Sequence, residues 1–249
     1  MIKFFRRIRH QLFSENKFSK YLLYALGEIV LVVIGILIAL QLNQIQQEKK
    51  ERTKELSYLN ELHLDFSSNQ IQLDSIIKNN TFRLHACRRL NFHVLQLRDN
   101  YGIDRFESYP YLDSMMFYQN EAFKHNTYTP KNGTIQAIMS SSTFDLIQND
   151  SLRRLLISWS DVLEDYQEEE KFTSDFLYGE YEPWVRSHYK FEDYFAPVNV
   201  EGWVSDREYN YRIIRAEFLK TLLNNGEAEG LAKTIDEIIR LTEKELTHD

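Results

Sequence analysis

One long apolar run near the start of the chain constrains its fold more than any other feature. Residues 21–42 read YLLYALGEIVLVVIGILIALQL and contain a single ionisable side chain, Glu28. A helix of about 20 such residues crosses a hydrocarbon core about 30 Å thick. The Leu, Ile and Val side chains, at about −0.3 to −0.6 kcal/mol each, outweigh the cost of about +3 kcal/mol for one central carboxylate. Because the run also lacks a small-x-small cleavage site, we predict an uncleaved transmembrane helix.

The charges of the chain are divided unevenly on the two sides of this run. Residues 1–20 have a net charge of +5 and the remaining residues −12, which together give −7. Six Lys and Arg precede the run, and four follow it closely at Lys49, Lys50, Arg52 and Lys54. This excess predicts a cytoplasmic tail over residues 1–20, and a periplasmic C-terminal domain if the membrane is the inner membrane of a bacterium. The tail is either a positive flank or an interfacial helix on anionic lipid, and we expect no nucleic-acid partner.

Glu28 lies inside the apolar run, where a carboxyl group is expected to be uncharged, to reach the near interface or to find a partner. At helical spacing it shares one stripe with Val32, Gly35 and Ala39. Gly35 and Ala39 form a small-xxx-small pair, which permits close approach of a second helix. The stripe therefore predicts an interface with another copy or another membrane subunit; the alternative is a tolerated Glu near the headgroups.

Two stretches of the chain carry a family resemblance. The first is NKFSKYLLYA followed by GEIVLVVIGILIALQ, over residues 16–25 and 27–41, and the second runs from Tyr128-Thr129-Pro130 through Gly133-Thr134 to Leu152-Arg153. Both resemble a bacterial family of single-pass membrane proteins of unknown function. The resemblance implies an inner-membrane anchor with a helical extracytoplasmic domain, and it implies no activity.

The composition favours an all-α fold for the rest of the chain. Only 8 Gly and 4 Pro occur in 249 residues, which leaves little material for the tight turns of a β fold. Residues 43–55 are almost entirely polar and predict a helical stalk. Residues 56–249 are long enough for one helical domain, in which the first helix packs either in a bundle or, less favourably, in a dimeric coiled coil.

Within residues 56–249, apolar periodicity predicts an antiparallel bundle of about five or six helices. A second helix is expected from Thr81 to Leu97, and another is expected to be capped near Asn149 and to run to about Tyr178. Gly179 and Pro183 predict a break after it. Asn225-Gly226 predicts a hairpin between the last two helices.

Few residue clusters suggest chemistry. His85 and Cys87 point to different faces of a helix, and the acidic residues around Glu164 lack the loop of a calcium site, so we expect no metal and no cofactor. The aromatic residues between Phe172 and Phe195 are dense enough to line a ligand pocket or partner groove, although core packing is the simpler interpretation. The residues we single out for such a surface are Tyr181, Trp184, Tyr189 and Tyr194.

Three classes of function remain open. The first is a non-enzymatic, membrane-anchored envelope subunit or scaffold, which assembles through its transmembrane helix and presents the helical domain to a partner. The second is a periplasmic ligand-sensing module that signals through a partner protein, because the short tail cannot hold an output domain. The third is a hydrolase of unrecognised chemistry. Because no catalytic motif is found, the sequence favours the first class and predicts no enzyme.

Overall fold

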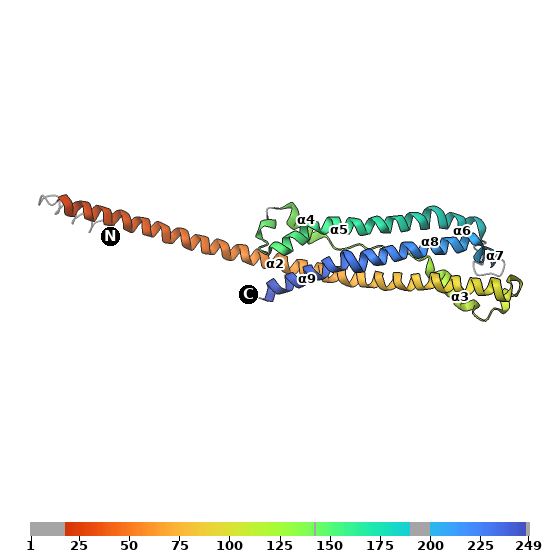
Figure 1. The fold of residues 1–249 in the computed structure, drawn as a ribbon. Coiled ribbons are helices and arrows are strands. Elements are labelled where there is room, and N and C mark those ends of the chain that lie inside the picture. Colours follow the sequence, from red (N-terminus) through yellow and green to blue (C-terminus); the bar gives the residue numbers. More distant parts are fainter. Residues whose placement is uncertain (1–17, 142, 190–199, 248–249) are drawn as a thin grey trace. The chain divides into compact units, whose positions relative to one another are not determined.

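The computed structural model describes residues 18–141, 143–189 and 200–247, in two compact units that meet between Glu55 and Leu56. These residues are helical and contain no strand, so the predicted all-α fold is confirmed (Figure 1). Residues 1–17, and with them most of the predicted tail, lie outside the described part.

The first unit contains the start of helix α2 (Phe18–Gln96). Its apolar run is exposed, and the helix is long and apolar enough to cross a membrane. Beyond the run, polar side chains one turn apart on the helix form hydrogen bonds with each other. The amide of Gln44 donates to Glu48 at 3.0 Å, and that of Gln47 donates to Glu51 at 2.7 Å. Such pairs at i and i+4 stabilise a helix that has no apolar face to bury.

The second unit is an antiparallel bundle of four rods, in which successive rods alternate in direction (Figure 1). The first rod is α2 from Leu56 onward, and a π-helical turn (Leu97–Tyr101), Gly102 at φ 85° and a 3-10 helix (Ile103–Ser108) follow it. The second rod consists of α3 (Leu112–Ala122), residues 123–132 and α4 (Gly133–Ser140). The third consists of α5 (Asp150–Asp175), η4 (Phe176–Tyr181) and α6 (Glu182–His188). The fourth consists of α8 (Asp206–Leu223), η7 (Asn224–Glu229) and α9 (Leu231–Thr247). Short helices η3 (Phe144–Leu146) and α7 (Val200–Trp203) precede the third and fourth rods.

The second rod is unusual because its middle is not helical. At about 1.5 Å per residue, the first, third and fourth rods are each about 60 Å long. Helices α3 and α4, with 11 and 8 residues, supply only about 28 Å between them. Residues 123–132 run along the bundle as an extended segment and, at about 3.3 Å per residue, add about 30 Å. The extended segment therefore lets a rod with too few residues match the length of its neighbours.

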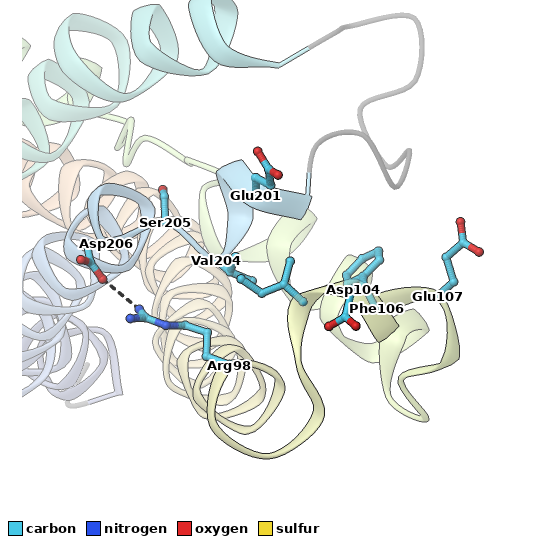
Figure 2. A pocket seen from close by; sticks show the side chains of 9 residues that line it. Arg98, Asp104, Phe106, Glu107, Glu201, Val204, Ser205 and Asp206 are labelled. Carbon is cyan, nitrogen blue, oxygen red and sulfur yellow. Dashed lines mark hydrogen bonds and ion pairs between the residues drawn. The ribbon is translucent and has the colours of Figure 1, made fainter.

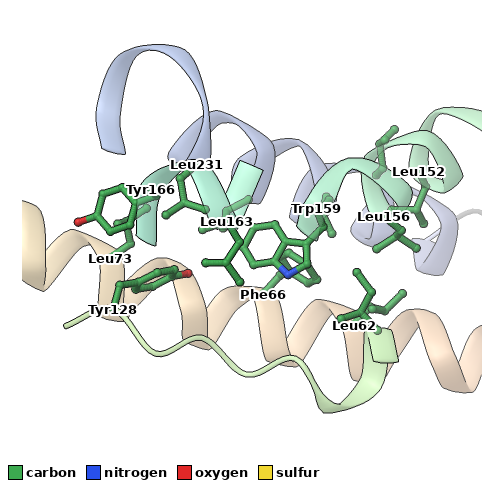
Figure 3. Packing of buried hydrophobic residues seen from close by; sticks show 14 of the residues in the cluster. Leu62, Phe66, Leu73, Tyr128, Leu152, Leu156, Trp159, Leu163, Tyr166 and Leu231 are labelled. Atoms are coloured by element: carbon green, nitrogen blue, oxygen red, sulfur yellow. The ribbon is translucent and has the colours of Figure 1, made fainter. Parts of the chain in front are cut away.

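The core follows a repeat in which buried positions alternate in steps of three and four residues, the spacing of coiled-coil seams. In α2 the seam includes Leu59, Leu62, Phe66, Asn69, Leu73, Ile76, Asn80, Arg83, Cys87, Leu90 and Val94. In α5 it includes Leu152, Leu156, Trp159, Leu163, Tyr166, Glu170 and Thr173. The two seams meet around Phe66 and Trp159, whose rings pack edge to face with centroids 4.8 Å apart (Figure 3). Helix α2 thus packs within a bundle.

Three sequence-based element boundaries are wrong. No break separates a helix at Thr81 from the one before it, because α2 is continuous to Gln96. The third rod stays helical past Gly179: η4 and α6 continue it without a break, and Pro183 lies in the first turn of α6, directly after the π-helical turn. The hairpin at Asn225-Gly226 does not form: α5 packs against both α8 and α9, and η7 joins them along one rod (Figure 1). Gly226 packs beside Tyr166 and Ile77, where an added Cβ would make ordinary contacts at 3.4 and 3.6 Å.

Candidate functional site

The predicted interface stripe is open on the surface of the first unit. Glu28, Val32, Gly35 and Ala39 are all exposed on one side of α2. A Cβ added at Gly35 would meet nothing within 4 Å, and the same is true of Gly27, about 80° away around the helix. The stripe thus has room for a neighbouring helix against its small residues.

The predicted aromatic surface lies elsewhere, in the second unit, and most of it is buried. Tyr181, Trp184 and Tyr189 are 7%, 5% and 5% exposed, and they pack with Tyr211 and Phe176 in an aromatic core. Tyr194 lies outside the described residues. The three described side chains therefore form packing layers of the bundle, and Tyr181 also lines an open groove, beside Phe123 and Tyr178.

These rings surround a buried carboxyl group, that of Glu208 on α8. Its Oε1 accepts hydrogen bonds from Gln119 Nε2 at 2.8 Å and from the Tyr181 hydroxyl at 3.1 Å. Arg212, one turn further along α8, places Nη1 3.5 Å from the same oxygen, and both side chains are 0% exposed. Burial raises the pKa of Glu208 and lowers that of Arg212, while each charge opposes the effect of burial on the other. The pair is an internal ion pair with no access for a substrate.

Two buried arginines of α8 also bind the ends of shorter helices. Arg212 donates to Asn91 Oδ1 at 2.5 Å and to the carbonyl of Trp203, the last residue of α7, at 3.1 Å. Arg215 donates to the carbonyls of Ala122 at 3.2 Å and Lys124 at 2.7 Å, at the C-terminus of α3. A cation is stabilised there by the negative end of the helix dipole. Both arginines therefore join α8 to the connections between the rods.

The single cysteine belongs to the same region. Cys87 is buried, and burial raises the pKa of its thiol to about 11. Since the thiolate is the reactive form of cysteine, this thiol is inert at neutral pH. His85, two residues earlier, is exposed, so the two side chains do not converge. Among the described residues, no group of three His, Cys, Asp or Glu side chains is arranged to hold a metal ion.

Buried polar side chains also hold the extended segment in place. The amide of Asn69 on α2 pairs with both backbone groups of Lys131: Nδ2 donates to its carbonyl at 3.0 Å, and Oδ1 accepts from its N–H at 2.7 Å. On α5, Glu170 Oε1 accepts from the N–H of Tyr128 at 2.8 Å, and Trp159 Nε1 donates to Asn132 Oδ1 at 2.9 Å. These bonds replace the backbone bonds that the segment would make as a helix.

Replacing Asn69 by alanine is expected to lower the free energy of unfolding by about 2 kcal/mol, because both backbone groups of Lys131 lose their partner. Chemical unfolding of the full-length protein in mild detergent measures this, and hydrogen exchange at the amide of Lys131 locates it. Asn60→Ala, at an exposed position of the same helix, is the control. Equal stability of the two variants would contradict the role of Asn69.

An open cleft lies at the end of the bundle where α2 gives way to its π-helical turn (Figure 2). Its volume is about 850 Å³, and an ion pair between Arg98 Nη1 and Asp206 Oδ1, 2.9 Å apart, crosses one side. The other lining residues are Ile103, Asp104, Phe106, Glu107, Glu201, Val204 and Ser205. The cleft is therefore acidic and exposed to solvent, and none of its described lining residues is a histidine or a cysteine.

Sequence reasoning missed the ion pair and the clamps of the extended segment. A sequence signal for the ion pair was present in α8. There Glu208, Arg212 and Arg215 continue the alternating three- and four-residue spacing of the buried Leu219 and Leu222. Charged residues at core positions of a repeat indicate a buried polar layer, whereas charged residues between them indicate a solvated face.

Comparison with known proteins adds a family and no activity. A family model described as a family of unknown function (DUF6090) matches residues 28–182, which include most of the apolar run, the extended segment and all of α5. Neither the curated proteins nor the solved structures gave a match. Since the matched residues make up more than half of the chain, this protein belongs to the DUF6090 family.

Proposed function

We propose that this protein is a non-enzymatic, membrane-anchored subunit or scaffold of the cell envelope. In this proposal residues 21–42 cross the membrane, and the helical bundle binds a partner. The observation that carries it is the exposed apolar run of α2, which holds a carboxyl group and an open glycine on one stripe. The buried polar groups of the bundle support it, because they join helices to one another and offer no surface to a substrate.

The proposed location is a bacterial inner membrane, with the tail in the cytoplasm and the bundle in the periplasm. Six Lys and Arg before the apolar run against four shortly after it favour this orientation. Cysteine use is compatible with it, since the one thiol is buried and forms no disulfide.

The stripe through Glu28 is proposed to seat the same helix of a second copy, or a helix of another membrane subunit. A carboxyl group in hydrocarbon is costly, and a partner helix can supply hydrogen bonds to it. Gly35 and Ala39 let two backbones approach closely enough for such bonds.

Replacing Gly35 by leucine is expected to disrupt assembly, because the side chain would hold the helices apart. Gly27→Leu is the matched control: it adds the same side chain to the same apolar run, also without a clash, on another face. Full-length protein is purified in gentle detergent, then sized and analysed by mass spectrometry with whatever accompanies it. We expect wild type and Gly27→Leu to remain in a defined complex that Gly35→Leu and Glu28→Ala lose.

Two results would contradict the proposal. If wild type runs as a lone monomer, assembly through α2 is wrong. If Gly27→Leu and Gly35→Leu dissociate equally, the contact does not involve the stripe through Glu28.

A further inference from the structure

A groove on the bundle surface lies between α4 and α5, and we call it the α4–α5 groove. It has a volume of about 490 Å³ and is lined by Ile135, Met139, Ile157, Trp159, Leu163 and Glu164, among others. Met139 and Ile157 are 44% and 53% exposed. An apolar groove with a flexible methionine on its side is suited to receive apolar side chains of a partner.

The floor of the groove is fixed in position. Trp159 is held on one side by its hydrogen bond to Asn132 and on the other by the ring of Phe66. Thr134, at the start of α4, donates to Asp65 Oδ2 on α2 at 2.6 Å. Because both walls are tied to the core, the groove needs little ordering when a partner binds.

Acidic residues of α5 lie in and beside the groove. Glu164 lines the groove, and Asp161, Asp165 and Glu168 are exposed beside it on the same turns of α5; none of the four forms an ion pair with any described residue. The opposite wall, α4, contains no charged residue. The groove thus combines an apolar floor with an acidic row along its α5 edge, of which Glu164 lines the groove itself.

We propose that the α4–α5 groove binds a basic amphipathic helix of a partner protein. The lining residues of α5 extend over three turns, about 16 Å, which matches a partner helix with apolar side chains at i, i+4 and i+7. Lys and Arg beside that apolar stripe would face the acidic row, so charge complementarity selects this occupant. The inference rests on the proposed role of the bundle as a partner-binding module and does not involve the stripe through Glu28.

The test uses the full-length chain in lipid nanodiscs of zwitterionic lipid. Cys87 is buried and inert, so Gln136→Cys places a single fluorophore in the groove, and Ser75→Cys places one on a distant face of α2. The probe is a synthetic amphipathic Leu–Lys helix of about four turns. A peptide of the same composition in scrambled order has no apolar face and is the peptide control.

We expect a saturable change in fluorescence at Gln136→Cys and none at Ser75→Cys. Asp161→Lys with Glu164→Lys is expected to weaken binding by about tenfold or more. Glu61→Lys with Asp74→Lys, on the exposed face of α2, reverses the same number of charges and is expected to leave binding unchanged.

Several results would overturn this proposal. The first is that the Leu–Lys helix gives no saturable change in fluorescence, and the second is that the scrambled peptide gives an equal change. The third is that the two double lysine variants weaken binding equally. Because Gly35→Leu leaves the groove intact, loss of peptide binding and loss of membrane assembly report separately on the two proposals.

Discussion

Replacing Arg212 by methionine is expected to lower the free energy of unfolding by about 3–5 kcal/mol. The substitution leaves the Glu208 carboxyl group in the core without its cation, and it frees the carbonyl of Trp203 and the amide of Asn91. A methionine fills much of the space of the arginine, so the loss reports on charge and hydrogen bonding. Urea unfolding of the full-length protein in mild detergent, followed by circular dichroism, measures it.

The double variant Glu208→Gln with Arg212→Met is the control for this prediction. It removes both charges, and the glutamine can still accept hydrogen bonds from Gln119 and Tyr181. We expect it to recover at least half of the lost stability, because a neutral buried group costs far less than an unpaired charge. A double variant no more stable than Arg212→Met would show that the carboxylate is not the source of the cost.

Stability is expected to depend on pH through Glu170. Burial raises the pKa of this carboxyl group from 4.5 to about 7, against the opposing effect of the hydrogen bond from Tyr128. The titratable groups near it are the hydroxyls of Tyr128 and Tyr166, and no cation contributes to the shift. The native state therefore binds more protons than the unfolded state between pH 4.5 and 7, so stability falls as the pH rises through this range.

Glu170→Gln is expected to remove this loss and to be more stable than wild type at pH 8 by about 3 kcal/mol, but equally stable at pH 4. Glutamine resembles the protonated acid and can still accept the hydrogen bond from Tyr128. The measurement is urea unfolding across this pH range. Glu168→Gln, at an exposed position two residues earlier, is the control and should leave the slope unchanged. An unchanged slope in Glu170→Gln would refute the assignment.

Much of the fold could be predicted because its signals are local. The apolar run, the cap at Asn149 and the buried side of α5 each depend on residues within a few turns of one another. The structure confirms the cap, since Asn149 Oδ1 accepts from Ser151 and Leu152, both at 3.0 Å. The apolar periodicity of the same helix agrees with the structure, in which Leu152, Leu156 and Trp159 are buried.

The remaining features depend on contacts that sequence spacing does not encode. No local sequence pattern near Lys131 predicts that its backbone will form hydrogen bonds with the side chain of Asn69, 62 residues earlier. Composition alone also cannot distinguish an aromatic core from an aromatic surface, which is why Tyr181 and Trp184 were candidates for both. Asn-Gly usually indicates a turn, but Asn225 and Gly226 lie within the π-helical segment η7, which joins α8 to α9.

The extended segment affects the order in which parts of the protein can fold during synthesis. A ribosome makes residues 123–132 well before the groups that bind them: Glu170 follows Tyr128 by 42 residues, and Arg215 follows Lys124 by 91. Until those residues emerge, the segment has only its contacts with α2. The middle of the chain is therefore completed by later parts of the same molecule, and a nascent chain halted before α8 would expose unsatisfied backbone to chaperones and proteases.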